Sequence, residues 1–226
     1  MTTYIWNGIY KSLDEIKDSR KSTLETNEWV EMETTKFLKH NKNINAFLNN
    51  NIEDNDVVMD FGGSLALSYF TINKKVKKYI VVETQKICER GKELLKDSGV
   101  VEFYSDIPKI KINKFFVKSA LQYSENYQVA LQKVIDLCNP EKMIFQDFAA
   151  GSIKETYLTL QTWKDDTQIP YLFIRLGDIY SFLRNNEYMP TSFSDSIRYF
   201  TYDQNNFPEE YRIRNSCDVV FEKENK

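Results

Sequence analysis

Short apolar runs that alternate with helical segments constrain the fold of this chain most. The runs predicted to be strands cover residues 57–59, 79–82, 101–104, 115–117 and 143–146. Helical segments are expected after them at 65–70, 83–95 and 125–138, and the last turns Val129, Leu131, Val134, Ile135 and Cys138 inward. Strands and helices that alternate at this spacing predict an α/β fold, a parallel sheet with helices on both faces. A further helix is predicted at 176–186, and two late strands at 188–193 and 217–221.

The first 50 residues have a different character. Apolar residues recur at three- and four-residue spacing between Leu13 and Phe37, as in amphipathic helices, and Ser12 with Glu15 fits a capping box. Residues 49–56 have the composition of a loop. We therefore expect residues 1–50 to form a helical segment packed on a core domain of residues 51–226, without a linker that divides the chain.

Composition excludes several classes of function. The 30 basic and 33 acidic residues give a net charge of -3, which lacks the basic surplus that binding to a nucleic-acid backbone requires. Long apolar runs are absent, so no contact within a membrane is expected. Three widely spaced cysteines and one histidine, His40, fit neither a disulfide framework nor a multi-histidine metal site. The sequence predicts a cytoplasmic protein without a metal, with His40 in a polar stretch at its surface.

One glycine pair stands out in a chain that has only seven glycines. Gly62-Gly63 directly follows the first strand of the sheet, where glycine permits a sharp turn and a close approach of a ligand to the backbone. Glu83 ends the second strand, where such sheets place a carboxylate for ribose hydroxyls. The G-x-G-x-x-G pattern of dinucleotide sites is missing, and Asp60 would repel a pyrophosphate. The pattern favours S-adenosylmethionine, whose amino-acid end is cationic.

The segment 57–69, Val-Val-Met-Asp-Phe-Gly-Gly-Ser-Leu-Ala-Leu-Ser-Tyr, resembles the cofactor motif of a known family. The family is assigned as S-adenosylmethionine-dependent methyltransferases, and its members occur in bacterial gene clusters for surface polysaccharides. Further segments agree in the same order, at residues 6–10, 82–83, 103–105, 119–123, 149–151, 160–161 with 169–170, and 217–221. The chain departs from the family at Ala66, where a third glycine is more common, and at 186–188, where a glycine before the tyrosine is missing.

The resemblance implies a Rossmann-like class I methyltransferase sheet of seven strands, the last antiparallel, with an N-terminal helical cap over the site. It assigns the methionine end of the cofactor to Asp60, Gly62, Gly63 and Ser64, and the ribose to Glu83. The adenine would lie near Tyr104, Ser105 and Asp106, and the sulfonium beside Ser119, Ala120 and Leu121.

Candidates for handling the methyl acceptor lie at the carboxyl edge of the sheet. Asp147 is the first candidate for a general base, although it could instead cap the turn that follows it. Tyr123 is a second catalytic candidate, and with Gln122 it could orient the acceptor. The resemblance adds Gln161, while Tyr10 or Trp6 could cover the site from the N-terminal segment.

The function predicted from the sequence is methyl transfer from S-adenosylmethionine, directed at oxygen, to a sugar or another small precursor of a surface glycan. The alternatives are an amine or a phosphoryl oxygen as acceptor, and a non-catalytic protein that binds the cofactor or a sister enzyme. A nucleotide-dependent oxidoreductase is disfavoured by the missing glycine pattern. The 14 Tyr and 15 Phe residues leave a homodimer face and a deep substrate cleft both open.

Overall fold

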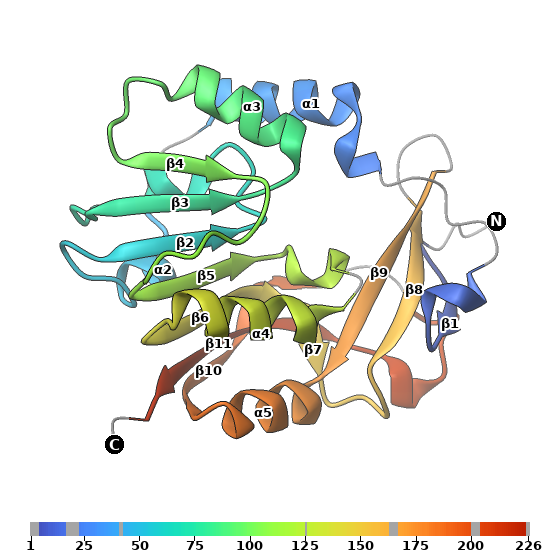
Figure 1. Cartoon of the computed structure of the whole chain (residues 1–226). Coiled ribbons are helices and arrows are strands. Elements are labelled where there is room, and N and C mark those ends of the chain that lie inside the picture. The colour runs from blue at the N-terminus through green and yellow to red at the C-terminus, as the bar shows by residue number, and fades with distance from the viewer. Residues whose placement is uncertain are drawn as a thin grey trace.

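A seven-stranded sheet forms the centre of the computed structural model, which describes residues 5–16, 23–40, 43–124, 126–162, 167–199 and 204–224. The strand order is β10-β11-β6-β5-β2-β3-β4 (Figure 1). The strands from β2 to β6 run parallel, and β11 is antiparallel to both of its neighbours, β6 and β10. The predicted sheet of seven strands with the last antiparallel is therefore confirmed. The strands are β2 (Val57–Phe61), β3 (Lys78–Val82), β4 (Val101–Tyr104), β5 (Lys114–Lys118), β6 (Lys142–Phe148), β10 (Tyr188–Tyr199) and β11 (Asn215–Lys223).

Helices cover both faces of this sheet, as the alternation of elements predicts. Neighbouring residues of a strand point to opposite faces, so Phe115 packs under α4 and α5 whereas Phe116 packs on the face of α2. The α-helices are α1 (Asn27–Leu38), α2 (Ala46–Asn49), α3 (Gln85–Leu94), α4 (Tyr127–Cys138) and α5 (Leu176–Asn185). Short 3-10 helices are η1 (Leu13–Glu15), η2 (Thr23–Glu25), η3 (Leu67–Thr71), η4 (Leu121–Tyr123) and η6 (Glu209–Tyr211).

The segment after the glycine pair differs from the expected helix at 65–70. It forms the five-residue 3-10 helix η3, because the backbone before it repeatedly enters the left-handed region. Gly62, Ser64 and Ala66 have φ of 68°, 51° and 60°. Ala66 holds the position at which the resembling family more often has glycine, the residue that adopts this φ without a steric penalty.

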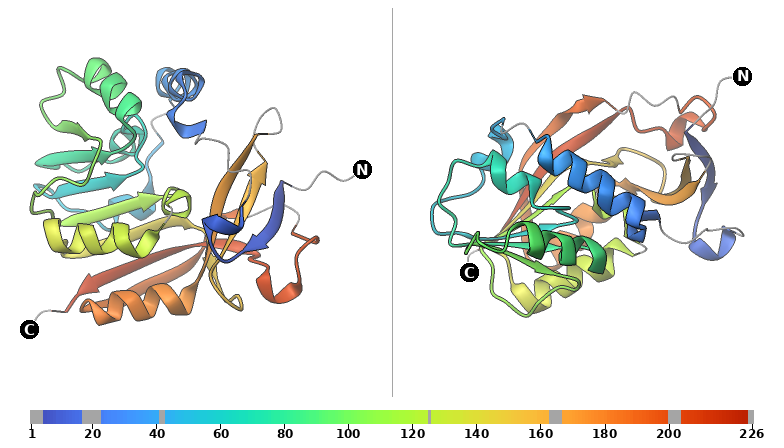
Figure 2. Two further views of the ribbon diagram at one scale, coloured as in Figure 1. Left: turned by 45° about the vertical axis from the view of Figure 1, so that its right-hand side comes forward. Right: turned by 90° about the horizontal axis from the view of Figure 1, so that it is seen from above.

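A second, four-stranded sheet corrects the expectation that residues 1–50 are helical. Residues 6–10 form a strand, and the order of this sheet is β1-β8-β9-β7. Figure 2 shows the small sheet beside the carboxyl ends of the parallel strands. Its aromatic core explains why the N-terminus is extended: Trp6 is buried with Tyr171 and Phe173. The strands are β1 (Trp6–Tyr10), β7 (Ala150–Gly151), β8 (Tyr157–Thr162) and β9 (Gln168–Arg175).

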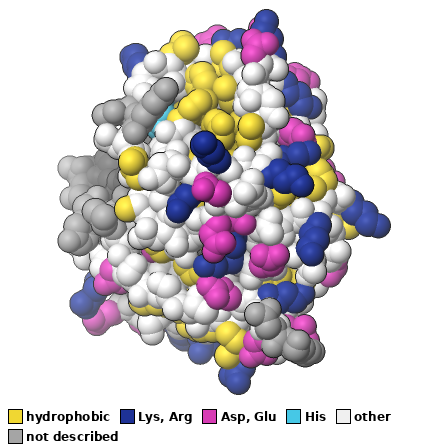
Figure 3. Space-filling view, turned by 90° about the vertical axis from the view of Figure 1, so that its left-hand side faces the viewer, with side chains coloured by type: hydrophobic (Ala, Val, Ile, Leu, Met, Phe, Trp, Pro, Cys, Tyr) yellow, Lys and Arg dark blue, Asp and Glu magenta, His cyan; other side chains and the backbone are white. Residues whose placement is uncertain are grey.

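The described surface and helices have the following features. Figure 3 shows basic and acidic side chains interspersed over the face opposite the small sheet. Among the described residues, no helix combines the length and the apolar character needed to cross a membrane. The same residues contain no group of three or more His, Cys, Asp or Glu side chains that could hold a metal ion.

Candidate functional site

The turn after β2 depends on both glycines for steric reasons. A Cβ on Gly62 would lie 2.2 Å from the Cβ of Ala120, and its φ of 68° already disfavours a side chain. A Cβ on Gly63 would lie 2.5 Å from the carboxyl carbon of Asp60. The second glycine therefore makes room for the Asp60 side chain, in addition to the close backbone approach expected from the sequence.

Asp60 lies under this turn and is only 1% exposed. The Tyr79 hydroxyl donates a hydrogen bond of 2.7 Å to its Oδ2. Burial raises the pKa of Asp60 to about 7, and this effect outweighs the opposing hydrogen bond from Tyr79. A cationic group bound beside Asp60 would favour its ionised form, because an opposite charge stabilises a carboxylate.

A cavity of about 830 Å³ opens at the carboxyl edge of the sheet, next to this turn. Here β2 pairs with β3 on one side and with β5 on the other, which makes it the switch point of the strand order. Ligands of open α/β sheets bind at such a point. Six of the predicted cofactor residues line the cavity together: Asp60, Gly62, Gly63, Ser64, Glu83 and Ser119.

Glu83 and Glu33 supply two further carboxylates to this cavity. Burial raises the pKa of Glu83, and the Thr84 N–H, which donates to its Oε2 at 2.6 Å, opposes that rise. Glu33 extends from α1, is 4% exposed and accepts a hydrogen bond of 2.5 Å from the Ser64 hydroxyl. Lys36 contacts the other Glu33 oxygen at 2.5 Å. The helix α1 is therefore fastened across the cavity to the glycine turn.

The α1 contribution is missing from the sequence interpretation, although a signal for it exists. Trp29, Glu33, Lys36 and His40 all line the cavity, and their spacing of four, three and four residues marks one face of a helix. His40 thus lies in the cavity wall rather than in the open surface position expected for it. Its Nε2 is buried, and no described residue hydrogen-bonds to it.

Five predicted cofactor residues lie outside the cavity wall: Tyr104, Ser105, Asp106, Ala120 and Leu121. The Tyr104 hydroxyl donates to Glu102 at 2.8 Å, and Asp106 is an exposed partner of Lys133 at 2.5 Å. Ala120 packs against Gly62, and Leu121 belongs to the core. Their roles in cofactor binding stay predictions.

The candidate base Asp147 is buried and engaged by neighbouring groups. Ser196 donates a hydrogen bond to its Oδ1, and the Lys118 ammonium lies 4.0 Å from its Oδ2. The cavity wall does not contain Asp147. It contains Lys118, Gln146 and Asp218, which the sequence interpretation did not propose as site residues.

Two of the predicted acceptor residues, Tyr123 and Gln161, meet between η4 and the small sheet. The Tyr123 hydroxyl donates to Gln161 Oε1 at 2.9 Å, and Gln161 pairs with Trp6 across β8 and β1. Gln122 is 3% exposed, and its buried Oε1 accepts no hydrogen bond from a described residue. Tyr10 packs against the main core from β1. These four residues lie outside the wall of the cavity at the glycine turn.

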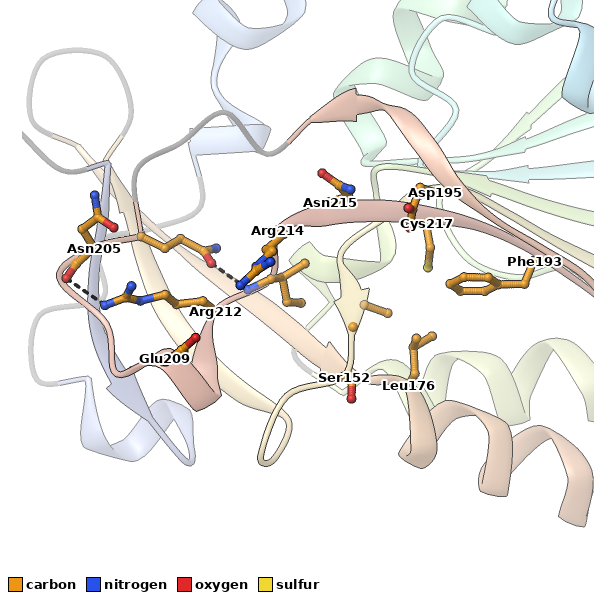
Figure 4. A pocket seen from close by; sticks show the side chains of 14 residues that line it. Ser152, Leu176, Phe193, Asp195, Asn205, Glu209, Arg212, Arg214, Asn215 and Cys217 are labelled. Atoms are coloured by element: carbon orange, nitrogen blue, oxygen red, sulfur yellow. Dashed lines mark hydrogen bonds between the residues drawn. The ribbon is translucent and has the colours of Figure 1, made fainter.

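A second cavity, of about 820 Å³, lies between the start of α5 and the strands β10 and β11 (Figure 4). Arg212 is held there by the carbonyl oxygens of Phe207 and Asn205 at 2.7 and 3.3 Å. None of the predicted site residues lines this cavity, and its two arginines share the wall with the acids Asp195 and Glu209. It lacks the glycine turn and the convergent carboxylates of the first cavity.

Comparison with known proteins identifies the fold. No protein-family model matches the chain, and no curated protein matches it in sequence. A chain of the Haloferax volcanii complex between the Trm112 methyltransferase activator and a methyltransferase is 11% identical, with a TM-score of 0.62 over 88% of this chain and 96% of that chain. An S-adenosylmethionine-dependent methyltransferase of Clostridium acetobutylicum is 10% identical, with a TM-score of 0.54 over 94% of this chain and 98% of the other.

A third similar structure contains bound ligands. It is the 1,6-didemethyltoxoflavin-N1-methyltransferase of Burkholderia thailandensis with 1,6-didemethyltoxoflavin and S-adenosylhomocysteine. It is 12% identical, with a TM-score of 0.57 over 92% of this chain and 93% of that chain. The fold of this chain is the Rossmann-like fold of these methyltransferases.

Proposed function

We propose that this protein is a methyltransferase that uses S-adenosylmethionine. One observation carries the proposal: a single cavity at the switch point of the sheet joins the Gly62-Gly63 turn to the Glu83 carboxylate. Carboxylates accept hydrogen bonds from ribose hydroxyls and attract the ammonium group of an amino acid, and Asp60, Glu83 and Glu33 offer them here. S-adenosylmethionine carries both groups, and when bound it supplies an electrophilic methyl group on a sulfonium.

The turn favours this cofactor over a dinucleotide. A pyrophosphate binds where a glycine turn leads into the N-terminus of an α-helix. In this chain the turn leads into the short 3-10 helix η3, and the buried acid Asp60 lies beneath it. The similar methyltransferase of Burkholderia thailandensis binds S-adenosylhomocysteine, which agrees with this choice.

The acceptor we propose is a hydroxyl group of a sugar or another small precursor of bacterial surface polysaccharide, methylated in the cytoplasm. The resemblance to the family of polysaccharide gene clusters supports the acceptor class. The three cysteines, Cys88, Cys138 and Cys217, are buried free thiols, which agrees with a reducing compartment.

Thermal unfolding with added ligands tests the cofactor assignment. S-adenosylhomocysteine at 100 times its Kd stabilises a native protein by about 2.7 kcal/mol. For a chain of this size we therefore expect the Tm to rise by about 5–10 °C, and NAD at the same concentration should leave the Tm unchanged. A rise with NAD alone would overturn the proposal.

A matched pair of variants tests the placement of the cofactor. Loss of a hydrogen bond to a charged group costs about 1.5–3 kcal/mol, so Glu83→Gln should weaken S-adenosylhomocysteine binding about 10- to 100-fold. Glu102→Gln is the control, because Glu102 lies on the neighbouring strand β4 outside the cavity wall. Equal affinities of both variants and the wild type, measured by calorimetry, would show that the cofactor binds elsewhere.

A further inference from the structure

A β-bulge separates two neighbouring carboxylates at the end of β6 and β11. Cys217 pairs with Phe148 and Val219 with Phe145, so Gln146 and Asp147 together lie opposite Asp218. Asp147 has a φ of 49°, which is uncommon for a residue with a side chain. Bulges redirect side chains and occur next to active sites. Here the bulge leaves Gln146 and Asp218 in the cavity wall and Asp147 behind it.

The contacts of the two acids suit different tasks. Asp147 is held by the Ser196 hydroxyl and by Lys118, and its own N–H donates a hydrogen bond of 2.9 Å to Asp218 Oδ1. Asp218 is 8% exposed, and burial raises its pKa. The charge of Asp147 raises that pKa further, whereas Lys118, Ser196 and the Asp147 N–H lower it. Asp218 therefore binds a proton more readily than an ordinary aspartate does, and it faces the cavity.

We propose that Asp218 is the catalytic base of this site, in place of Asp147, and that Asp147 and Ser196 position it. This inference rests on the proposed function. As the acceptor oxygen bonds to the transferred methyl group, its O–H bond breaks and the proton passes to the Asp218 carboxylate, which becomes a neutral carboxylic acid. The electron pair of the broken C–S bond stays on sulfur, so S-adenosylhomocysteine leaves uncharged. Lys118 lies in the same wall and offsets one of the two negative charges before the transfer.

Two ligands test this assignment without knowledge of the acceptor. S-adenosylhomocysteine is neutral at sulfur, whereas sinefungin carries an ammonium group on carbon at that position and is otherwise alike. A carboxylate that faces the reacting centre attracts sinefungin preferentially, because opposite charges attract strongly in a buried site. In Asp218→Asn we expect S-adenosylhomocysteine to bind within about threefold of the wild type, while sinefungin loses about tenfold in affinity.

A further variant serves as the control. Asp195→Asn makes the same chemical change on β10, where Asp195 pairs with Cys217 and lines the second cavity. This variant should change the ratio of the two affinities by less than about threefold. A ratio that stays at the wild-type value in Asp218→Asn, with S-adenosylhomocysteine still bound, overturns the assignment and leaves the proposed function standing. A wild-type protein that binds neither ligand overturns both.

The pH dependence of wild-type binding gives an answer even where a variant fails to fold. Protonated Asp218 carries no charge, so the preference for sinefungin should increase as pH rises through its raised pKa. Titration of Asp60 affects both ligands alike, because they share the same amino-acid end. A preference that is constant from about pH 4 to pH 8 contradicts a titrating carboxylate at this position.

Discussion

The two ends of the cavity differ in how the chain brings their residues together. At the cofactor end, Asp60, Gly62 and Gly63 are near neighbours in sequence, and their geometry follows from the turn after one strand. At the proposed acceptor end, Asp218 meets Asp147 across 71 residues. The first end therefore depends on local backbone conformation and the second on long-range assembly. Substitutions in the turn should therefore act through local backbone strain and close contacts, whereas substitutions where distant segments meet should lower the stability of the whole fold.

The largest effect on stability should come from the small sheet beside the carboxyl edge. Trp6 is 1% exposed, and its ring lies 4.6 Å from that of Tyr171 and 5.1 Å from that of Phe173. Removing a buried tryptophan side chain costs about 3–5 kcal/mol, so Trp6→Ala should lower the free energy of unfolding by that amount. Chemical denaturation measures it. Phe193→Ala is the control, because Phe193 is 51% exposed and its loss should cost about 0.5 kcal/mol or less.

Trp6→Ala also tests the separation of the two ends. At a temperature where the variant is still folded, S-adenosylhomocysteine should bind it about as tightly as it binds the wild type, because the glycine turn is local. A loss of stability below about 1 kcal/mol would show that the small sheet is not fixed by this side chain.

Gly62→Ala should lower the free energy of unfolding by about 3 kcal/mol, which is less than the upper part of the range expected for Trp6→Ala. About 1–2 kcal/mol of this loss comes from the left-handed backbone and about 1–3 kcal/mol from overpacking against Ala120. The double variant Gly62→Ala with Ala120→Gly removes the overpacking alone, because the added Cβ would lie 2.2 Å from the Ala120 Cβ. A double-mutant cycle of unfolding free energies separates the two costs.

Gly177→Ala is the matched control for this cycle. Gly177 lies in the helix α5, and a Cβ there would have its nearest neighbouring atom, Arg175 Nε, at 3.7 Å. This variant should be as stable as the wild type or more stable by about 0.4–1 kcal/mol. If Ala120→Gly restores no stability in the Gly62→Ala background, the close contact with Ala120 is not the reason that position 62 requires glycine.

The same contrast explains what the sequence could predict. The order of strands and helices in the seven-stranded sheet followed from the sequence, because the apolar pattern of each element lies within a short stretch of the chain. The glycine turn and Glu83 could be placed because strand ends of a parallel sheet meet at one edge. The 3-10 helix after the turn could not be predicted, because it depends on the positive φ of Ser64 and Ala66. The residue types serine and alanine do not indicate a positive φ.

The residues of the proposed acceptor end are harder to predict from the sequence, for a different reason. Asp147 follows a strand, as a base at the sheet edge should, but a bulge opposite Asp218 turns it away from the cavity. Bulge positions depend on the pairing of two strands that lie far apart in the chain. The strand at Trp6 was missed likewise, because its partner Gln161 and its aromatic neighbours all lie beyond residue 150.

The buried acid of the turn should make stability depend on pH. The pKa of Asp60 is about 7, raised by burial above that of an unfolded aspartate, so the folded protein binds more protons between about pH 4 and pH 7. Stability should therefore fall as pH rises through this window and level off above it. The variant Asp60→Asn should lack this decrease in stability, because its side chain does not titrate. Denaturation midpoints of the wild type and the variant, measured from pH 5 to pH 8, should therefore converge towards low pH. A parallel pH dependence in both would show that Asp60 does not titrate in this range.

The smallest effect should come from the link between α1 and the turn. Ser64 Oγ donates a hydrogen bond of 2.5 Å to Glu33, which holds α1 over the cofactor end. Its loss should cost about 1 kcal/mol, so Ser64→Ala should bind S-adenosylhomocysteine about fivefold more weakly and exchange the amide hydrogens of α1 faster. Ser105→Ala is the control, since Ser105 also follows a strand but lies outside the cavity wall. Because the sequence assigned both serines to the cofactor, a loss of affinity in Ser105→Ala but not in Ser64→Ala would place the adenosine at β4 and remove α1 from the site.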